Sequence, residues 1–502
     1  MRFADTPQVS IVYELWLGDQ LAASRLVFGL GDMVVMLKTT YDENLNRYAP
    51  GRVLLYLAIQ DLFTYCPEKT IEFYTDANVD QLSWATDRRW IAHWTFHRNA
   101  ASVFVNGLLG SMVSWRLKFL PNRHADIDIV NEDKIDAYRD FKSLPDDVET
   151  FFLAAESGDF QFGLDWYRNL IETVFKDHEG AYIFSLRRQG KLLACIPILA
   201  TKKRFGNEVE SLGNFYTTLY NPAFGPDVRY ADLVILINAI LKTLGPVTSF
   251  RFTAMDPEAP GYRRLKNAIH AAGMAEFGFF CFGNWYLPKP MGWQSYLASL
   301  RGATRSTIKR MNKKFSVAGG TLEILTDGEG VAKALAAYEQ VYASSWKQPE
   351  PFPEFMPRLV NLSKDRGWLR LGVAWLNGKP VAAQLWIVAN KKANIYKLAY
   401  DESFKAFAPG TVLTAALMEH VIEIDSVVEV DFLSGDDPYK RFWMSARRER
   451  WGIVAYNPRT LGGGLGLLQE VSGRALKPIV ARAKVLMRAK IFSAQSPGTP
   501  TP

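Results

Sequence analysis

The sequence predicts an α+β fold in which helices cover both faces of a mixed β-sheet, and it predicts that this fold occurs more than once along the chain. Strand-like blocks both precede and follow segments with apolar residues at helical spacing, which is typical of αβα layers around a mixed sheet. A segment near the N-terminus also resembles one near the C-terminus. The 502 residues, 48% of them apolar, are enough for about three compact units.

The internal repeat appears when the sequence is compared with itself at a shift of 359 residues. Tyr41–Leu54 reads YDENLNRYAPGRVL, and Tyr400–Leu413 reads YDESFKAFAPGTVL. So long an ordered match indicates two copies of one unit. The other correspondences are Lys38 over Lys397, Trp84 over Trp443 and, with a slip of one residue, Leu21–Ala23 over Val381–Ala383.

The sequence of the C-terminal copy predicts a β-hairpin, a third strand, a loop, a helix and further short elements. An Asn377–Gly378 pair marks the hairpin turn, because these residues readily adopt positive φ angles. The expected elements are strands at 373–376, 381–389 and 394–400, a helix at 412–424, a strand at 427–433, a helix at 439–446 and a strand at 451–456.

The middle of the chain repeats this pattern without the sequence identity. We expect a hairpin of Tyr182–Leu186 and Leu192–Ala200, a helix at Leu233–Leu244, and strands at Thr248–Thr253 and Phe277–Leu287. One long helix is then expected within 292–319.

The N-terminal copy is predicted to form only half of such a domain. The C-terminal copy has helices and a strand ahead of its hairpin, at about 293–365, whereas the N-terminal copy begins almost at its hairpin. A half-sheet has an unpaired edge and an uncovered face. We therefore expect it to dock on the middle domain, to pair between protomers in a homo-oligomer, or to be the remnant of a longer chain.

Composition excludes several classes of protein. No apolar run is long enough to span a membrane, and the first residues lack the apolar run of a signal peptide, so we expect a cytoplasmic protein. Three scattered cysteines and two histidines at 93 and 97 without a third ligand predict no metal site. No metalloprotease, NTPase or hydrolase motif is present. The net charge of +7 favours anionic ligands.

A glycine-containing loop leads from the third strand of the C-terminal copy into its helix. Such a loop presents backbone N–H groups beside the positive end of the helix dipole, which is a geometry that binds phosphate. The loop here is Lys405–Thr411. The alternative is an ordinary strand-to-helix turn with Pro409 in the first helical turn.

These residues together resemble a known family. The hairpin, the YDESFKAFAPGTVL loop and helix, the VDF strand and GDDPYKRFW, preceded by the basic LRGATRSTIKRMNKKF, look like the GNAT-type acyltransferases of the CelD/BcsL class. Members are bacterial proteins associated with cellulose and exopolysaccharide synthesis, and they are more distantly related to FemAB-like aminoacyltransferases. The resemblance covers Ala125–Arg459, and residues 1–98 as a partial copy.

The resemblance implies acetyl-CoA or another acyl-CoA as co-substrate, with no metal. In this family the loop holds the coenzyme A pyrophosphate, and Lys405, Ala408 and Gly410 occupy the matching positions, with Thr411 beside them. Lysine stands where the family has Arg or Gln, and Ala-Pro-Gly stands where it has Gly-x-Gly.

A compact polar set follows two neighbouring predicted strands. We expect Asp436 or Asp401 to act as base or substrate anchor, Tyr439 as the acid for the leaving thiolate, and Lys440 as a contact to an anionic part of the substrate. The alternative is that Asp436 or Asp437 caps the following helix. The first copy has no Tyr or Lys at the equivalent positions, so we expect it to be structural.

Further residues are expected to contact the substrate. Tyr396 and Tyr400 end a strand beside this set, and Arg301, Arg305 and Lys309 form a cationic stripe with no nearby acid. A basic helix at 474–491 docks on the protein itself or on an anionic membrane surface, and the tail after Ser493 is expected to be disordered.

Taken together, the sequence predicts a partial GNAT-like copy at 1–120, a diverged GNAT-like domain at 125–290, a catalytic one at 291–459 and a basic helix with a tail at 460–502. The expected reaction transfers an acyl group, in the simplest case acetyl, to a sugar- or lipid-linked envelope or exopolysaccharide intermediate. Two alternatives stay open, namely a FemAB-like transferase that uses aminoacyl-tRNA and a non-catalytic scaffold of a polysaccharide assembly.

Overall fold

The computed structural model describes residues 8–30, 33–65, 70–73, 84 and 133–474. The chain folds into two compact units, Met1–Arg98 and Asn99–Pro502, and each is described by itself. The two histidines at 93 and 97, the basic helix beyond Arg474 and the tail lie outside the described residues.

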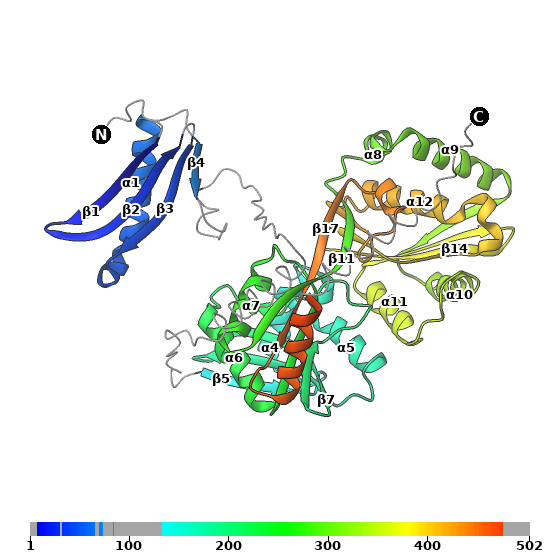
Figure 1. Cartoon of the computed structure of the whole chain (residues 1–502). Coiled ribbons are helices and arrows are strands. Elements are labelled where there is room, and N and C mark those ends of the chain that lie inside the picture. Colours follow the sequence, from blue (N-terminus) through cyan, green and yellow to red (C-terminus); the bar gives the residue numbers. More distant parts are fainter. Residues whose placement is uncertain (1–7, 31–32, 66–69, 74–83, 85–132, 475–502) are drawn as a thin grey trace, which may run out of the picture. The chain divides into compact units, whose positions relative to one another are not determined.

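The N-terminal unit is a four-stranded sheet with one helix on one face (Figure 1). The strand order is β1-β2-β3-β4, antiparallel except for the parallel pair β3 and β4. Val27, Val34 and Met36 pack against Leu55 and Leu62 of the helix. The elements are β1 (Gln8–Leu17), β2 (Gln20–Leu30), β3 (Met33–Tyr41), η1 (Glu43–Tyr48), α1 (Pro50–Tyr65) and β4 (Thr70–Phe73).

The second unit is built on one 13-stranded mixed sheet that runs through its two halves. The first half contains β5 (Asp133–Tyr138), α4 (Asp146–Glu156), η2 (Phe160–Phe162), α5 (Leu164–Thr173), β6 (Ala181–Arg188), β7 (Lys191–Lys203), β8 (Gly206–Ser211), β9 (Ala223–Phe224), α6 (Tyr230–Thr243), β10 (Val247–Met255), α7 (Pro260–Ala271) and β11 (Ala275–Pro288).

The second half supplies the remaining strands and helices. They are α8 (Trp293–Ser299), α9 (Gly302–Val317), β12 (Gly320–Leu325), α10 (Gly330–Ala343), α11 (Phe355–Asp365), β13 (Leu369–Leu376), β14 (Lys379–Ala389), β15 (Lys392–Tyr400), η3 (Glu402–Phe407), α12 (Pro409–Glu423), β16 (Glu429–Asp431), η4 (Lys440–Phe442) and β17 (Ala446–Tyr456), and a helix follows at 461–474. Helices α8, α9 and α12 cover one face of this part of the sheet, and α10 and α11 cover the other (Figure 1).

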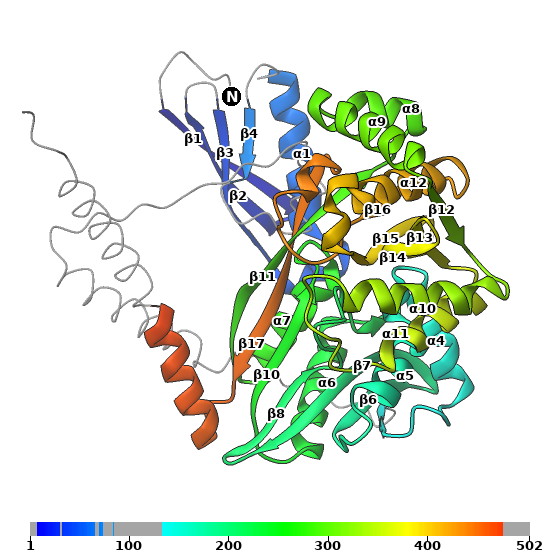
Figure 2. The same cartoon turned by 90° about the vertical axis from the view of Figure 1, so that its right-hand side faces the viewer.

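Two long antiparallel strands, β11 and β17, join the halves (Figures 1 and 2). The end of β11 pairs with β16 of the second half, while the end of β17 pairs with β10 of the first half. The sequence predicts a closing strand at 451–456, and the structure inserts that strand between β10 and β11. Each half therefore has a strand from the other in its sheet.

The internal repeat has the same backbone in both copies. Strands β2 and β14 begin 359 residues apart, at Gln20 and Lys379, so the one-residue slip assumed upstream is wrong. The amide of Asp42 bonds the Ala22 carbonyl at 3.0 Å, as that of Asp401 bonds the Val381 carbonyl at 2.9 Å. The predicted α+β fold with mixed sheets is confirmed.

The two copies differ in what covers them. Val53 and Tyr56 of α1 are 43% and 56% exposed, whereas their counterparts Val412 and Ala415 of α12 are 2% and 1% exposed beneath α8 and α9. Within the described residues of the N-terminal unit, nothing corresponds to α8–α11 or β12. In the part of the chain that the structure describes, this face of α1 is exposed; that residues 1–120 form half a domain, and what covers this face, stay predictions.

Three local predictions are corrected by the structure. The single long helix of 292–319 is two helices, because Leu300 and Arg301 take extended φ/ψ angles and Leu300 turns into the core. The predicted helix at 439–446 is a single 3₁₀ turn, η4, because β17 already begins at Ala446. The predicted strand at 427–433 is only the three residues of β16.

A buried ionic network connects the halves around Asp431, which is 1% exposed. Its carboxylate contacts Lys392 at 3.1 Å and Arg448 at 2.5 Å, and Lys392 also contacts Asp159 of the first half at 3.1 Å. Burial alone would raise the pKa of Asp431, yet the two cations hold it far below its usual value. The charged form is therefore the one that the fold stabilises.

We expect Asp431→Asn to lower the free energy of unfolding by about 3 kcal/mol, because the neutral amide removes a negative charge that Lys392 and Arg448 contact inside the protein. Urea denaturation followed by tryptophan fluorescence measures this change. Asp227→Asn is the matched control, since its ion pair with Lys191 is exposed and should contribute under about 1 kcal/mol. Equal losses in the two variants would contradict the structural importance of the network.

Candidate functional site

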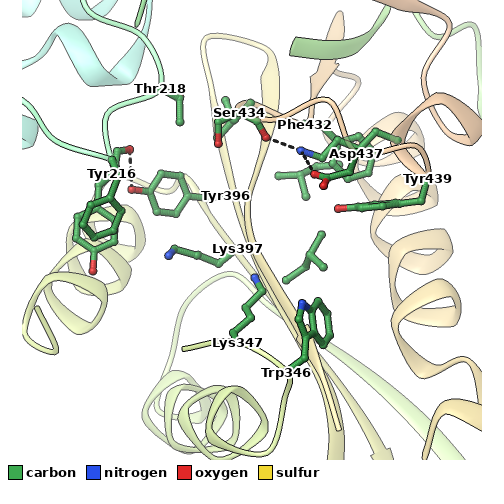
Figure 3. Close-up of a pocket in the computed structure, with 15 residues that line it drawn as sticks. Tyr216, Thr218, Trp346, Lys347, Tyr396, Lys397, Phe432, Ser434, Asp437 and Tyr439 are labelled. Carbon is green, nitrogen blue, oxygen red and sulfur yellow. Dashed lines mark hydrogen bonds and ion pairs between the residues drawn. The ribbon is translucent and has the colours of Figure 1, made fainter. Parts of the chain in front are cut away.

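A pocket opens where two parallel strands part. β15 pairs with β16 over three residues, and beyond them the Phe432 amide bonds the Trp285 carbonyl of β11 instead. β15 itself continues to Tyr400 with β14 on its other side. The pocket between the parted strands has a volume of about 640 Å³ (Figure 3) and is lined by Phe215, Tyr216, Thr218, Trp346, Lys347, Ile395, Tyr396, Lys397, Leu398, Phe432, Leu433, Ser434, Asp437, Tyr439 and Lys440.

A β-bulge in β15 turns side chains toward this pocket. Lys397 pairs with Leu385 and Ile395 with Trp386, so Tyr396 has no partner on β14. A bulge re-aims the side chain of the extra residue. The Tyr396 hydroxyl donates to the Tyr216 carbonyl at 3.1 Å, which ties β15 to the first half.

The backbone at the end of β16 is held in an unusual conformation. Leu433 has φ 57°, a left-handed conformation that costs a residue with a branched side chain about 1–3 kcal/mol. Its amide donates to Asp431 Oδ1 and its carbonyl accepts from Asn284 Nδ2, both at 2.7 Å. The buried network thus fixes the turn that carries Ser434 into the pocket.

A second cluster of charge lies on the opposite wall. Glu350 accepts from the Tyr216 hydroxyl at 2.6 Å and pairs with Lys397 at 2.5 Å. Burial alone would raise the pKa of Glu350, but hydrogen bonds from Lys397 and Tyr216 hold it below its usual value. The Tyr216 ring stacks on Phe355 with centroids 4.0 Å apart, which fixes this loop of the first half beside the pocket.

Lys347 extends into the same space as Lys397 (Figure 3). Burial, followed by repulsion from Lys397, lowers the pKa of Lys347 to about 8. Its ammonium lies 5.6 Å from the Tyr342 ring centroid and 5.8 Å from that of Trp346. Aromatic faces therefore border this cation.

Tyr439 and Lys440, two of the predicted catalytic residues, line the facing wall. Figure 3 shows the Tyr439 hydroxyl directed into the pocket. Burial, and then the nearby Asp437, raises the pKa of Tyr439 to about 12, so the hydroxyl keeps its proton at neutral pH. Lys440 Nζ contacts Asp437 at 3.1 Å and also donates to the Ser434 carbonyl, so Asp437 pairs with this lysine and caps no helix.

The predicted carboxylates Asp436 and Asp401 lie outside the lining. Asp436 accepts from Trp285 Nε1 at 2.7 Å and pairs with Arg447 at 2.6 Å. Asp401 caps η3 through the Ser403 amide at 3.0 Å and pairs with Lys379 at 3.1 Å. Both oxygens of each carboxylate are engaged, and their catalytic roles stay predictions.

The predicted phosphate loop also lies beside the pocket and not in its lining. Helix α12 begins at Pro409, which has no N–H. The Ala408 amide bonds the Lys405 carbonyl at 3.0 Å, and the Thr411 amide bonds the Ala408 carbonyl at 2.9 Å. Among the described hydrogen bonds none uses the amide of Gly410, so this amide is the one that the helix N-terminus offers.

The same loop geometry occurs in the N-terminal copy. Ala49 and Ala408 have φ of 49° and 47°, and the Ala49 amide bonds the Asn46 carbonyl at 3.0 Å. A Cβ on Gly51 or on Gly410 would lie 3.4 Å from the ring of the preceding strand's last tyrosine. The loop is therefore part of the repeated fold as well as a candidate binding element.

Tyr400 connects the loop with the pocket. Its ring centroid lies 4.9 Å from that of Trp346, which lines the pocket, and a Cβ added at Gly410 would lie 3.4 Å from the Tyr400 ring. The ring of Tyr400 therefore lies between the N-terminus of α12 and the wall of the pocket.

The predicted cationic stripe lies on the outside of α9. Arg305 and Lys309 are exposed, and Arg305 donates to the Ala298 carbonyl at 2.6 Å. Arg301 precedes the helix and lies 5.8 Å from the Phe442 ring centroid. None of the three lines the pocket.

Sequence reasoning missed several residues that the structure brings together. Lys347, Glu350 and Trp346 come from the connection after α10, and Tyr216 comes from a loop 180 residues before Tyr396. Lys397 carries the one available signal, because it lies in the repeat opposite Lys38. Across the described ranges, no helix has the length and apolar character needed to cross a bilayer, and no group of three or more His, Cys, Asp or Glu is placed to hold a metal ion.

Comparison with solved structures finds proteins of low sequence identity. FemX is 14% identical, with 66% of this chain and 99% of FemX covered, at a TM-score of 0.47. The C-terminal domain of a putative lysylphosphatidylglycerol synthetase from Agrobacterium fabrum is 13% identical, over 53% and 81%, at 0.36. A tandem GNAT protein from the clavulanic acid biosynthesis pathway is 13% identical, over 64% and 98%, at 0.35. No curated protein matches the chain.

The sequence also matches a protein family, described as acetyltransferase (GNAT) domain, at residues 10–79 and 302–441. These two segments contain the two copies of the internal repeat, and the second contains the parted strands and the loop. The chain thus carries GNAT acetyltransferase domain sequence in both copies of its repeat, which confirms the predicted class of a GNAT-family acyltransferase.

Proposed function

We propose that the pocket between β15 and β16 transfers an acyl group from an acyl-CoA, most simply acetyl-CoA, to an amine or hydroxyl of an acceptor. The observation that carries the proposal is the protonated Tyr439 hydroxyl, which faces a pocket at the point where two parallel strands part. Thioester aminolysis needs an acid that protonates the leaving thiolate, and backbone N–H groups that no strand pairs can steady the carbonyl oxygen.

In the proposed acyl transfer, Tyr439 is the acid that protonates the leaving thiolate. The acceptor nitrogen or oxygen attacks the thioester carbonyl carbon, the new C–N or C–O bond forms, and the C–S bond breaks. The departing thiolate takes the proton of the Tyr439 hydroxyl. The resulting phenolate then takes the proton that the acceptor loses, because the pKa of about 12 makes it a strong base.

The donor's diphosphate is proposed to bind at the N-terminus of α12. Gly410 supplies an amide there, Lys405 a charge, and the helix dipole favours an anion. Tyr400 and Trp346 would then carry the pantetheine arm from this helix into the pocket.

A second candidate uses aminoacyl-tRNA as the donor. It is favoured by a specific observation, since the Ala408 and Thr411 amides are already bonded within the loop while the cations of α9 are exposed. An exposed row of cations can bind a nucleic acid backbone without any diphosphate site.

The acceptor, the partners and the location follow from the family resemblance and belong to the same proposal. The acceptor is a small sugar or a lipid-linked envelope or exopolysaccharide intermediate, and the protein works in the cytoplasm or at the inner face of the membrane. The N-terminal unit is proposed to be structural and to support a homo-oligomer. A non-catalytic scaffold is the function that remains if neither donor binds.

We expect Gly410→Asp to weaken CoA binding at least tenfold, because the new carboxylate repels the diphosphate at the helix N-terminus. Calorimetric titration with acetyl-CoA measures the affinity. Gly51→Asp is the matched control, since it places the same side chain in the same loop geometry of the N-terminal copy. Identical heats for both variants, or none for the unaltered protein, would count against this donor site.

We expect Tyr439→Phe to lower kcat by about 100-fold with little change in KM, because the variant cannot protonate the thiolate. Release of CoA thiol with a panel of amino sugars measures the rate. The loss should be the same at pH 6 and pH 8, since the Tyr439 hydroxyl stays protonated at both. Tyr230→Phe, far along the chain on α6, is the control, and equal rates in the two variants would exclude Tyr439 as the acid.

For the second candidate we expect aminoacyl-tRNA binding to fall steeply between 50 and 200 mM salt, as backbone contacts do. Fluorescence anisotropy with labelled tRNA follows this change. Lys309 and Lys313 are both exposed on α9, and Lys309→Glu combined with Lys313→Glu should abolish the binding. A salt-independent affinity, or none, would eliminate tRNA as the donor.

A further inference from the structure

The pocket holds more positive than negative charge. Three lysines line it, and two of them have a carboxylate partner: Lys397 pairs with Glu350 at 2.5 Å, and Lys440 pairs with Asp437 at 3.1 Å. Among the described ion pairs none includes Lys347. One cation of the pocket is therefore left without an acidic partner.

The surroundings of Lys347 make this cation costly to keep unless a ligand compensates it. Burial lowers its pKa more than Lys397 does, and its ammonium lies over the faces of Tyr342 and Trp346. Glu350 is near, but its oxygens already accept from Tyr216 and Lys397. A ligand anion would supply the missing charge.

We propose that Lys347 binds an anionic group, a phosphate or a carboxylate, on a ligand that occupies this pocket. The proposal rests on the proposed function, because it concerns the same pocket and names the chemistry of its substrate. The aromatic rings of Trp346, Phe432 and Tyr439 then border the uncharged part of the ligand. The acyltransfer reaction requires only an amine or hydroxyl, so the anion is an added feature of the substrate.

The pH dependence of anion binding distinguishes Lys347 from the other lysines. Binding is strongest while Lys347 is protonated, and it is lost as the pH rises through about 8, which is the reverse of what a general base would show. The charged groups that face Lys347 are Lys397 on β15, Glu350 after α10, and Asp437 and Lys440 after β16. These other groups form pairs with one another.

Calorimetric titration with inorganic pyrophosphate and with acetate tests the proposal. We expect Lys347→Met to weaken the binding of the preferred anion at least tenfold at pH 7, while Lys347→Arg retains it. Lys333→Met is the matched control, because that lysine lies over the Trp375 ring at 5.1 Å but outside the pocket. Thermal unfolding of each variant shows whether its fold is intact.

The outcomes separate the possibilities. Binding of pyrophosphate alone identifies a phosphate ligand, and binding of acetate alone identifies a carboxylate ligand. The anion belongs to the donor if Lys347→Met weakens CoA binding and Gly410→Asp does not. The anion belongs to the acceptor if Lys347→Met leaves CoA binding unchanged. Equal anion binding by Lys347→Met and the unaltered protein, or no binding of either anion, would overturn the proposal and leave the Tyr439 test unaffected.

Discussion

The pairing of β11 with β17 is the constraint on which the second unit depends. These strands carry one sheet from β5 to β12, and each enters the half of the unit to which it does not belong in sequence. They also bring Asn284 and Arg448 against Asp431, and these two residues stabilise its buried charge together with Lys392 of β15. Because Asp431 holds Leu433 in a left-handed conformation, the same network sets the direction in which the chain leaves β16.

That direction creates the pocket. Two parallel strands that paired along their length would fill the space between them with backbone hydrogen bonds. Here pairing ends after three residues, and side chains from four separate segments surround the opening. The walls combine aromatic rings with paired charges, and the charge that lacks a partner belongs to Lys347.

The repeat separates features of the fold from features of the site. Both copies keep the bulge in the third strand. Both also keep an aspartate that caps the 3₁₀ turn and a left-handed alanine before the helix. These residues are Asp42 and Ala49 in the first copy, and Asp401 and Ala408 in the second. The N-terminal copy has leucine at the position of Tyr396, and the covering helices of the second copy are absent from its described residues. The shared caps and turns therefore serve the backbone. Of the residues that line the pocket, Lys397 has a lysine counterpart in Lys38, whereas Tyr396 and Tyr439 have no tyrosine counterpart in the first copy.

The sequence alone determined the repeat, the hairpins, the strand-to-helix loop and the GNAT type of the repeated domain, because these depend on neighbouring residues and on periodicity. It also directed attention to Tyr396, Tyr439 and Lys440, which line the pocket. Only the tertiary structure placed β17 between β10 and β11 and brought Tyr216 and Glu350 together, since contacts across 134 residues leave no local pattern. The charge balance at Lys347 was likewise beyond the sequence, because a lysine's partners are decided by which chain segments fold against it.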